Sequence, residues 1–143
     1  MNRTTIPDTE LQQYLGGISG KLLFLFDTCH SAAVIGAKGD FRSDVDKFAN
    51  ELRAAENGVV VFASSTDNQF SHEKDEWKNG AFTKAVVEGF GDQAARPEAQ
   101  AVLVVDLYSY VSRRVNDLTN GEQSPMLAIP KTVEDFPIAV ERQ

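Results

Sequence analysis

The chain has 143 residues, enough for one domain with a buried core. Its net charge of −7, from 14 basic and 21 acidic residues, argues against binding to nucleic acid or to an anionic membrane surface. A single cysteine excludes an internal disulfide, and without a signal peptide or a bilayer-length apolar run we expect a cytoplasmic protein with no membrane partner.

A predicted helix and a very apolar strand come first along the chain. Apolar side chains recur at helical spacing over residues 6–18, Pro7 suits the first turn, and the Gly16–Gly17 pair is expected to end the helix. Residues 22–26 (LLFLF) are apolar at every position. Such a run is typical of a strand covered on both faces, as in a parallel sheet between helices.

Strands and helices alternate through the rest of the chain, which predicts a three-layer α/β sandwich. Phe90 is expected to point inward, Asp106 to cap a helix, and Asn120–Gly121 to end that helix. Residues 31–44 are interpreted as an exposed loop, and three prolines indicate edge or extended structure in the tail. The expected strands are 59–63 and 101–105, and the expected helices are 45–55, 80–90 and 106–119.

Polar residues follow the first strand, where open α/β sheets place ligands and reactive groups. Cys29 is the chain's only cysteine and a candidate nucleophile, although a cysteine at a strand end is more often inert packing. A free thiol has a pKa of about 8.5, so it needs a base or a positive environment. Asp27 would raise that pKa, and it is better explained as a binder of a cationic group or as an ordinary loop acid.

The D-x-C-H-S pattern at residues 27–31 resembles the nucleophile motif of the caspase-like cysteine peptidases, in their bacterial and metacaspase branch. Three later segments resemble the same family in order, although Ala32 replaces its usual glycine. They are 59–66 (VVVFASST), 79–89 (NGAFTKAVVEG, with the G-[AV]-F-T signature) and 106–115 together with the Gln123–Pro125 turn. The resemblance implies a single, partial caspase-like domain over residues 1–143. We expect an α/β/α sandwich with a mostly parallel sheet, incomplete at its N-terminal side.

The resemblance also implies a set of site residues. It makes Cys29 the nucleophile, with its backbone N–H as one oxyanion donor, and Asp27 a wall of the primary specificity pocket. Substrates would be peptides or proteins with arginine or lysine before the scissile bond, arginine being preferred because its guanidinium binds a carboxylate bidentately. Asp67 is a weaker pocket candidate, since a solvated loop acid is commoner. We expect no cofactor and no metal: the acidic cluster at residues 73–76 fits no metal motif.

The base histidine of the family is not matched in this chain. It is expected roughly fifty residues before the nucleophile, whereas no histidine precedes Cys29. His30 is adjacent to the nucleophile and would point away from it, and His72 lies in a polar loop. We therefore expect the base to come from a missing segment or a partner, and the isolated chain to have little or no activity.

The missing segment would leave residues 22–26 as an exposed edge strand, which folded proteins avoid. We expect this strand to pair with a separate polypeptide, another copy of the chain or rearranged termini. Lys38 and Arg42, in the loop after the nucleophile, are candidate processing sites if the pocket selects basic residues, or else ordinary surface charges.

Three interpretations follow from the sequence. The first is a cysteine endopeptidase component, and the second is a catalytically inactive caspase-like module that acts in protein interaction or regulation. The third, a non-protease α/β fold, finds little support. Ile35 stands where a phosphatase loop needs arginine, and the serine-hydrolase motif G-x-S-x-G is absent.

Overall fold

A computed structural model describes residues 8–27, 58–64, 80–94 and 101–140 of the chain. The predicted helix at residues 45–55, the predicted loop at 31–44 and four of the candidate site residues lie outside the described residues. These four are Cys29, His30, Asp67 and His72.

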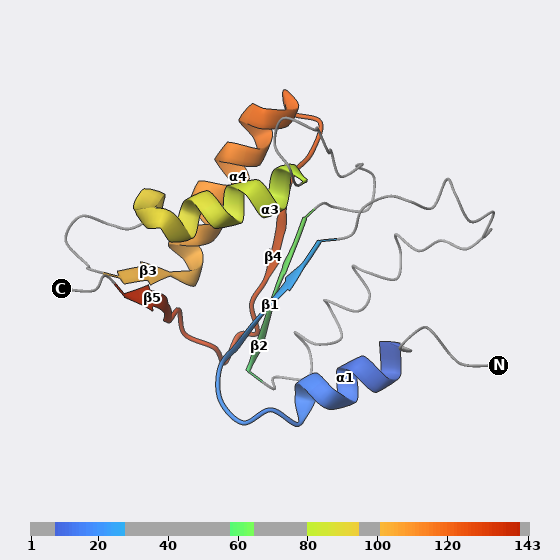
Figure 1. Ribbon diagram of the computed structural model, residues 1–143. Coiled ribbons are helices and arrows are strands. Elements are labelled where there is room, and N and C mark those ends of the chain that lie inside the picture. Colours follow the sequence, from blue (N-terminus) through green and yellow to red (C-terminus); the bar gives the residue numbers. More distant parts are fainter. Residues whose placement is uncertain (1–7, 28–57, 65–79, 95–100, 141–143) are drawn as a thin grey trace, which may run out of the picture.

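The elements alternate as the sequence predicts (Figure 1). The helical elements are α1 (Asp8–Gly16), α3 (Ala81–Glu88), the π-helical turn η3 (Gly89–Gln93) and α4 (Val104–Thr119). The strands are β1 (Leu22–Phe26), β2 (Val59–Ala63), β3 (Ala101–Leu103), β4 (Met126–Ala128) and β5 (Pro137–Val140). Two of the C-terminal elements are the short strands expected from the prolines.

The main described sheet has the strand order β1-β2-β4. β1 and β2 are parallel from Leu22↔Val59 to Phe26↔Ala63, so their carboxyl ends meet at one edge of the sheet. β4 runs antiparallel to β2, and β3 forms a separate antiparallel pair with β5. The expected mostly parallel arrangement therefore holds for β1 and β2, while the described pairs made by the C-terminal strands are antiparallel.

Helices cover both faces of this sheet, as a three-layer α/β/α sandwich requires. Every residue of β2 is buried, and alternate residues point to opposite faces. Phe62 packs in a core with residues of α3 and α4, whereas Val59 and Val61 pack with Leu15 of α1 on the other face. Figure 1 shows α1 on one side of the strands and α3 with α4 on the other. The predicted α/β architecture is confirmed.

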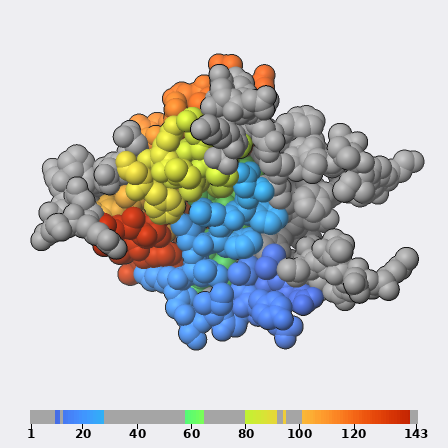
Figure 2. Space-filling model, in the orientation of Figure 1, coloured from blue at the N-terminus to red at the C-terminus, as the bar shows by residue number. Residues whose placement is uncertain are grey.

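β1 is the outer strand of the described sheet. Its residues are half-buried, and Leu25 keeps 38% of its surface exposed. The space-filling view shows β1 at the molecular surface between α1 and α3 (Figure 2). The prediction that two strands are covered on both faces holds in full for β2. In β1 it holds in part: Leu23 packs against the core on one face and Leu22 and Phe24 against the core on the other, but all three stay only half-buried. The expected edge position of this strand agrees with its place in the described sheet.

Helix α4 begins before the predicted cap, Asp106. The segment leading into β5 passes the start of α4 and supplies hydrogen-bond acceptors from a distant part of the chain. The Asp135 carboxylate accepts from the backbone N–H of Val105 (3.3 Å), and the Phe136 carbonyl accepts from that of Val104 (3.1 Å). Asp106 therefore lies inside the first turn. The predicted end is confirmed: Asn120 adopts the left-handed conformation, with φ of 52°.

Phe90 is 38% exposed, so the prediction that it points inward is wrong. α3 ends at Glu88, and a π-helical turn begins at Gly89. The prediction assumed that Phe90 continues the α-helical spacing of side chains around the helix axis, and a π-helical turn changes that spacing. The α3–α4 contact is close at this point. A Cβ atom on Gly89 would lie 2.6 Å from Cδ1 of Leu107, a fully buried side chain.

Candidate active site

The candidate site begins at the edge where β1 and β2 end. Asp27 is the first residue after β1, and Ser64 is the first after β2. The backbone N–H of Ser64 donates to the carbonyl of Phe26 (2.9 Å), which extends the ladder between the two strands by one bond. The hydrogen bond therefore holds the segments that follow β1 and β2 at a fixed separation. Ligands commonly bind at such positions, beyond the carboxyl ends of parallel strands.

The exposed carboxylate of Asp27 is hydrogen-bonded to the first turn of α3. Thr83 Oγ1 donates to Asp27 Oδ2 over 2.6 Å, although 56 residues separate the two in sequence. Thr83 is the third residue of α3, where the backbone N–H groups carry partial positive charge. The carboxylate therefore lies beside a donor hydroxyl at the positive end of a helix.

Thr83 is a contact of the candidate site that the sequence interpretation does not include. It is the threonine of the G-A-F-T segment at residues 80–83, which resembles the family's signature at this place in the chain. No local signal links a helix residue to an acid so far away in sequence. The link depends on the parallel pairing of β1 with β2 and on the docking of α3 against β2.

That docking is set by aromatic packing. Phe82 is buried and meets the ring of Phe62 edge-to-face, with centroids 4.9 Å apart and planes at 82°. Tyr108 of α4 contacts the same Phe62 ring at 5.6 Å. Since Phe82 precedes Thr83, the packing of one residue fixes where the hydroxyl of the next one lies.

Gln123 also contacts the chain at the carboxyl end of β2. Its fully buried side chain donates from Nε2 to the carbonyl of Ser64 (2.7 Å). Its backbone N–H donates to Thr119 Oγ1 (3.1 Å), and that hydroxyl donates to the carbonyl of Val115 (2.8 Å). A chain of hydrogen bonds thus connects the last turn of α4 to Ser64, the first residue after β2.

Comparison with protein-family models gives a match to the caspase domain of peptidase family C14 over residues 2–137. The chain belongs to the caspase domain family. Comparisons with curated proteins and with solved structures gave no match. Membership accounts for the α/β fold and indicates a cysteine-peptidase-like function with peptide or protein substrates.

The structure places one predicted site residue of this caspase domain. Asp27 lies exposed directly after the carboxyl end of β1, and its carboxylate accepts from Thr83. Cys29 follows two residues later, outside the described residues, as do Asp67 and both histidines. The geometry therefore brings together Asp27, Thr83 and the exit of β2.

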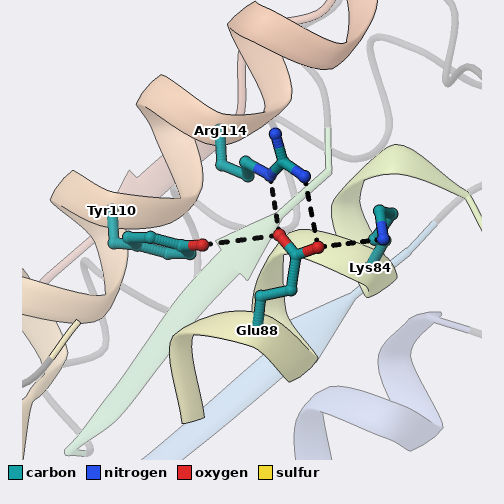
Figure 3. Close-up of polar contacts among 4 residues, drawn as sticks. All are labelled: Lys84, Glu88, Tyr110 and Arg114. Atoms are coloured by element: carbon teal, nitrogen blue, oxygen red, sulfur yellow. Dashed lines mark hydrogen bonds and ion pairs between the residues drawn. The ribbon is translucent and has the colours of Figure 1, made fainter. Parts of the chain in front are cut away.

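A second polar cluster lies farther along α3 and ties it to α4 (Figure 3). The Glu88 carboxylate accepts from Arg114 Nε (2.7 Å) and Nη2 (3.2 Å), and Lys84 Nζ lies 2.9 Å from Oε1. The Arg114 hydrogen bond is the main reason that the pKa of Glu88 falls to about 2. Tyr110 donates a longer bond of 3.4 Å to the same carboxylate, and burial raises the pKa of the Tyr110 hydroxyl. This carboxylate is saturated with protein donors, so its role is to hold the two helices together.

Within the described residues, no group of three or more histidine, cysteine, aspartate or glutamate side chains could hold a metal ion. The same part of the caspase domain contains no helix of the length and apolarity needed to span a membrane.

Proposed function

We propose that this caspase domain carries the nucleophile and the specificity acid of a cysteine endopeptidase that cleaves after arginine or lysine. One observation carries the proposal. The Asp27 carboxylate is exposed at the carboxyl end of β1, held by Thr83, two residues before the chain's only cysteine. A negative charge next to a nucleophilic thiol opposes formation of the thiolate, so its presence there is better explained by a positively charged substrate.

The proposed reaction is acyl transfer to sulfur. The Cys29 thiolate attacks the carbonyl carbon after the basic residue, and the C–N bond breaks as the leaving amine takes a proton. Water then attacks the thioester, releasing the new carboxylate and regenerating the thiol. The backbone N–H of Cys29 would stabilise the oxyanion in both steps.

The proposed specificity acids bind the substrate before the thiolate attacks it. Asp27 would bind the basic side chain, and a guanidinium would be favoured over an ammonium because it can contact both carboxylate oxygens. Asp67 is proposed as a second acid of the same pocket. Asp67 comes three residues after Ser64, the first residue after β2. β2 ends at the same edge of the sheet as β1, which is followed by Asp27.

The base histidine is proposed to come not from His30 or His72 but from a missing segment or a partner that completes the site. We also propose that this polypeptide, or a second copy of the chain, pairs with β1. The position of β1 at the end of the order β1-β2-β4 and the exposed Leu25 support this pairing. Assignment to the bacterial and metacaspase branch rests on the D-x-C-H-S pattern and on the acid that precedes the cysteine. A single thiol nucleophile would stay reduced in the cytoplasm.

A second candidate function is that of a catalytically inactive caspase-like module that binds other proteins. The observation in its favour is that neither histidine of the chain is at the family's upstream position. Both candidates predict weak hydrolysis by the chain alone, so simple turnover would not separate them.

Covalent labelling separates the two candidates. The full chain would be incubated with two peptidyl chloromethyl ketones that differ only in having arginine or norleucine next to the reactive group, and adducts would be measured by mass spectrometry. We expect faster labelling by the arginine probe, no labelling of Cys29→Ala, and loss of the arginine preference in Asp27→Asn. Equal labelling by both probes in the wild-type chain would contradict the proposal and favour the inactive module.

A further inference from the structure

We infer that Thr83 is a positioning residue, which orients the Asp27 carboxylate so that arginine is selected over lysine. The inference rests on the proposed binding of a basic side chain by Asp27. It adds to that proposal a second residue, on a different element, and a physical basis for choosing between two substrates of equal charge.

Both ends of the Thr83–Asp27 hydrogen bond are fixed relative to β2. On one side, β1 ends in register with β2 at Phe26↔Ala63, so Asp27 leaves the ladder at a defined place. On the other side, the Phe82 ring packs against Phe62 and holds the first turn of α3. The 2.6 Å bond therefore connects two rigid elements through a shared strand.

The direction of the Thr83 hydroxyl is informative. Threonine hydroxyls inside helices commonly donate to the carbonyl three or four residues earlier. Thr83 donates instead to Asp27 Oδ2, out of the helix and across to the end of β1. An exposed aspartate can otherwise rotate about its side-chain bonds, and one short bond to Oδ2 restricts the plane of its carboxylate.

A fixed carboxylate plane affects arginine more than lysine. A guanidinium makes two parallel N–H···O bonds only when its plane and that of the carboxylate are matched. An ammonium is a compact charge with rotatable donors, and it tolerates many carboxylate orientations. Loss of the Thr83 hydroxyl should therefore weaken the binding of an arginine side chain strongly and that of a lysine side chain little.

The test measures by NMR titration the affinity of the full chain for two probes, Nα-acetyl-arginine amide and Nα-acetyl-lysine amide. Both probes have blocked termini, so their only charge is that of the side chain. The variants are Thr83→Val, which keeps the shape without the hydroxyl, Thr83→Ser, which keeps the hydroxyl, and Asp27→Asn. Thr132→Val is the matched control, an exposed threonine after β4, at the edge of the sheet opposite to Asp27. Thr83→Ala replaces Thr83→Val if the latter does not fold.

We expect Thr83→Val to lower the affinity for the arginine probe about fivefold, the usual effect of one lost hydrogen bond. Its affinity for the lysine probe should change less than about twofold on the same argument. Thr83→Ser should restore the arginine preference, and Thr132→Val should leave it unchanged. Equal losses for both probes, or none, in Thr83→Val would overturn the positioning role while leaving Asp27 as the binding acid. Equal binding of the arginine probe by wild type and Asp27→Asn would instead overturn the proposed pocket itself, and the role of Thr83 with it.

Discussion

Arg114 of α4 and Glu88 of α3 form a bidentate ion pair, with Nε···Oε2 at 2.7 Å and Nη2···Oε1 at 3.2 Å. Glu88 lies five residues after Thr83 on the same helix, α3. The ion pair joins α3 to α4 beside the close contact at Gly89, so it helps to hold the helix whose first turn contacts Asp27.

The ion pair predicts a pH-dependent contribution to stability. The folded-state pKa of Glu88, about 2, lies below the ordinary value of 4.5, so the contribution is present in full above about pH 4.5 and is lost as the pH falls toward 2. Since both side chains keep solvent contact, at 26% for Glu88 and 36% for Arg114, we expect a contribution of about 1 kcal/mol.

Denaturant unfolding of wild type and Glu88→Gln at pH 6.5 and pH 3 measures this contribution. The difference in unfolding free energy should be about 1 kcal/mol at the higher pH and should shrink at the lower one. Glu134→Gln, a change at an exposed glutamate, is the control and should have little effect at either pH. A Glu88→Gln penalty that stays constant or grows on acidification would contradict the assignment.

The Gln123–Ser64 hydrogen bond predicts a second effect on stability. Gln123→Met keeps the approximate size and shape of a fully buried side chain but removes the donor to the Ser64 carbonyl. Loss of a buried hydrogen bond of this kind costs about 1–3 kcal/mol, which unfolding in urea would detect. Gln13→Met, at an exposed position of α1, should change stability by less than about 0.5 kcal/mol. Equal effects of the two substitutions would show that the Gln123 bond contributes nothing.

The sequence was most informative where local pattern alone determines structure. The apolar run at residues 59–63 became the fully buried β2, and Asn120 ended α4 in the left-handed conformation. Asp27 could be placed at the end of a strand because Leu22–Phe26 was recognisable as one.

Features that depend on contacts between distant segments could not be predicted in this way. The carboxylate that accepts from the first turn of α4 belongs to Asp135, about thirty residues beyond the start of the helix. A prediction from nearby residues considers only acids at the helix start, and it therefore gave Asp106 as the cap. Thr83 contacts Asp27 only because α3 packs on β2 beside the end of β1. For β1, composition alone indicated a buried strand, and its edge position was expected only from the resemblance to a family whose preceding segment is not matched here.

Two glycines on the same turn give a matched test of the α3–α4 contact. A Cβ on Gly89 would lie 2.6 Å from Leu107 Cδ1 and 3.2 Å from Tyr110 Cδ1, whereas a Cβ on Gly91 meets no atom within 4 Å among the described residues. Neither glycine has a positive φ, so alanine is conformationally acceptable at both positions.

Alanine at Gly91 should therefore be neutral or stabilising by a few tenths of a kcal/mol, because it lowers the entropy of the unfolded chain. Alanine at Gly89 lowers the entropy of the unfolded chain by the same amount, but its Cβ must displace the buried Leu107 side chain. Overpacking of this kind costs about 1–3 kcal/mol of stability. Thermal unfolding of the two single variants should show a lower midpoint for Gly89→Ala than for Gly91→Ala. Equal midpoints would mean that α4 can move away from α3 without cost. The rigid docking that places Thr83 against Asp27 would then need another source.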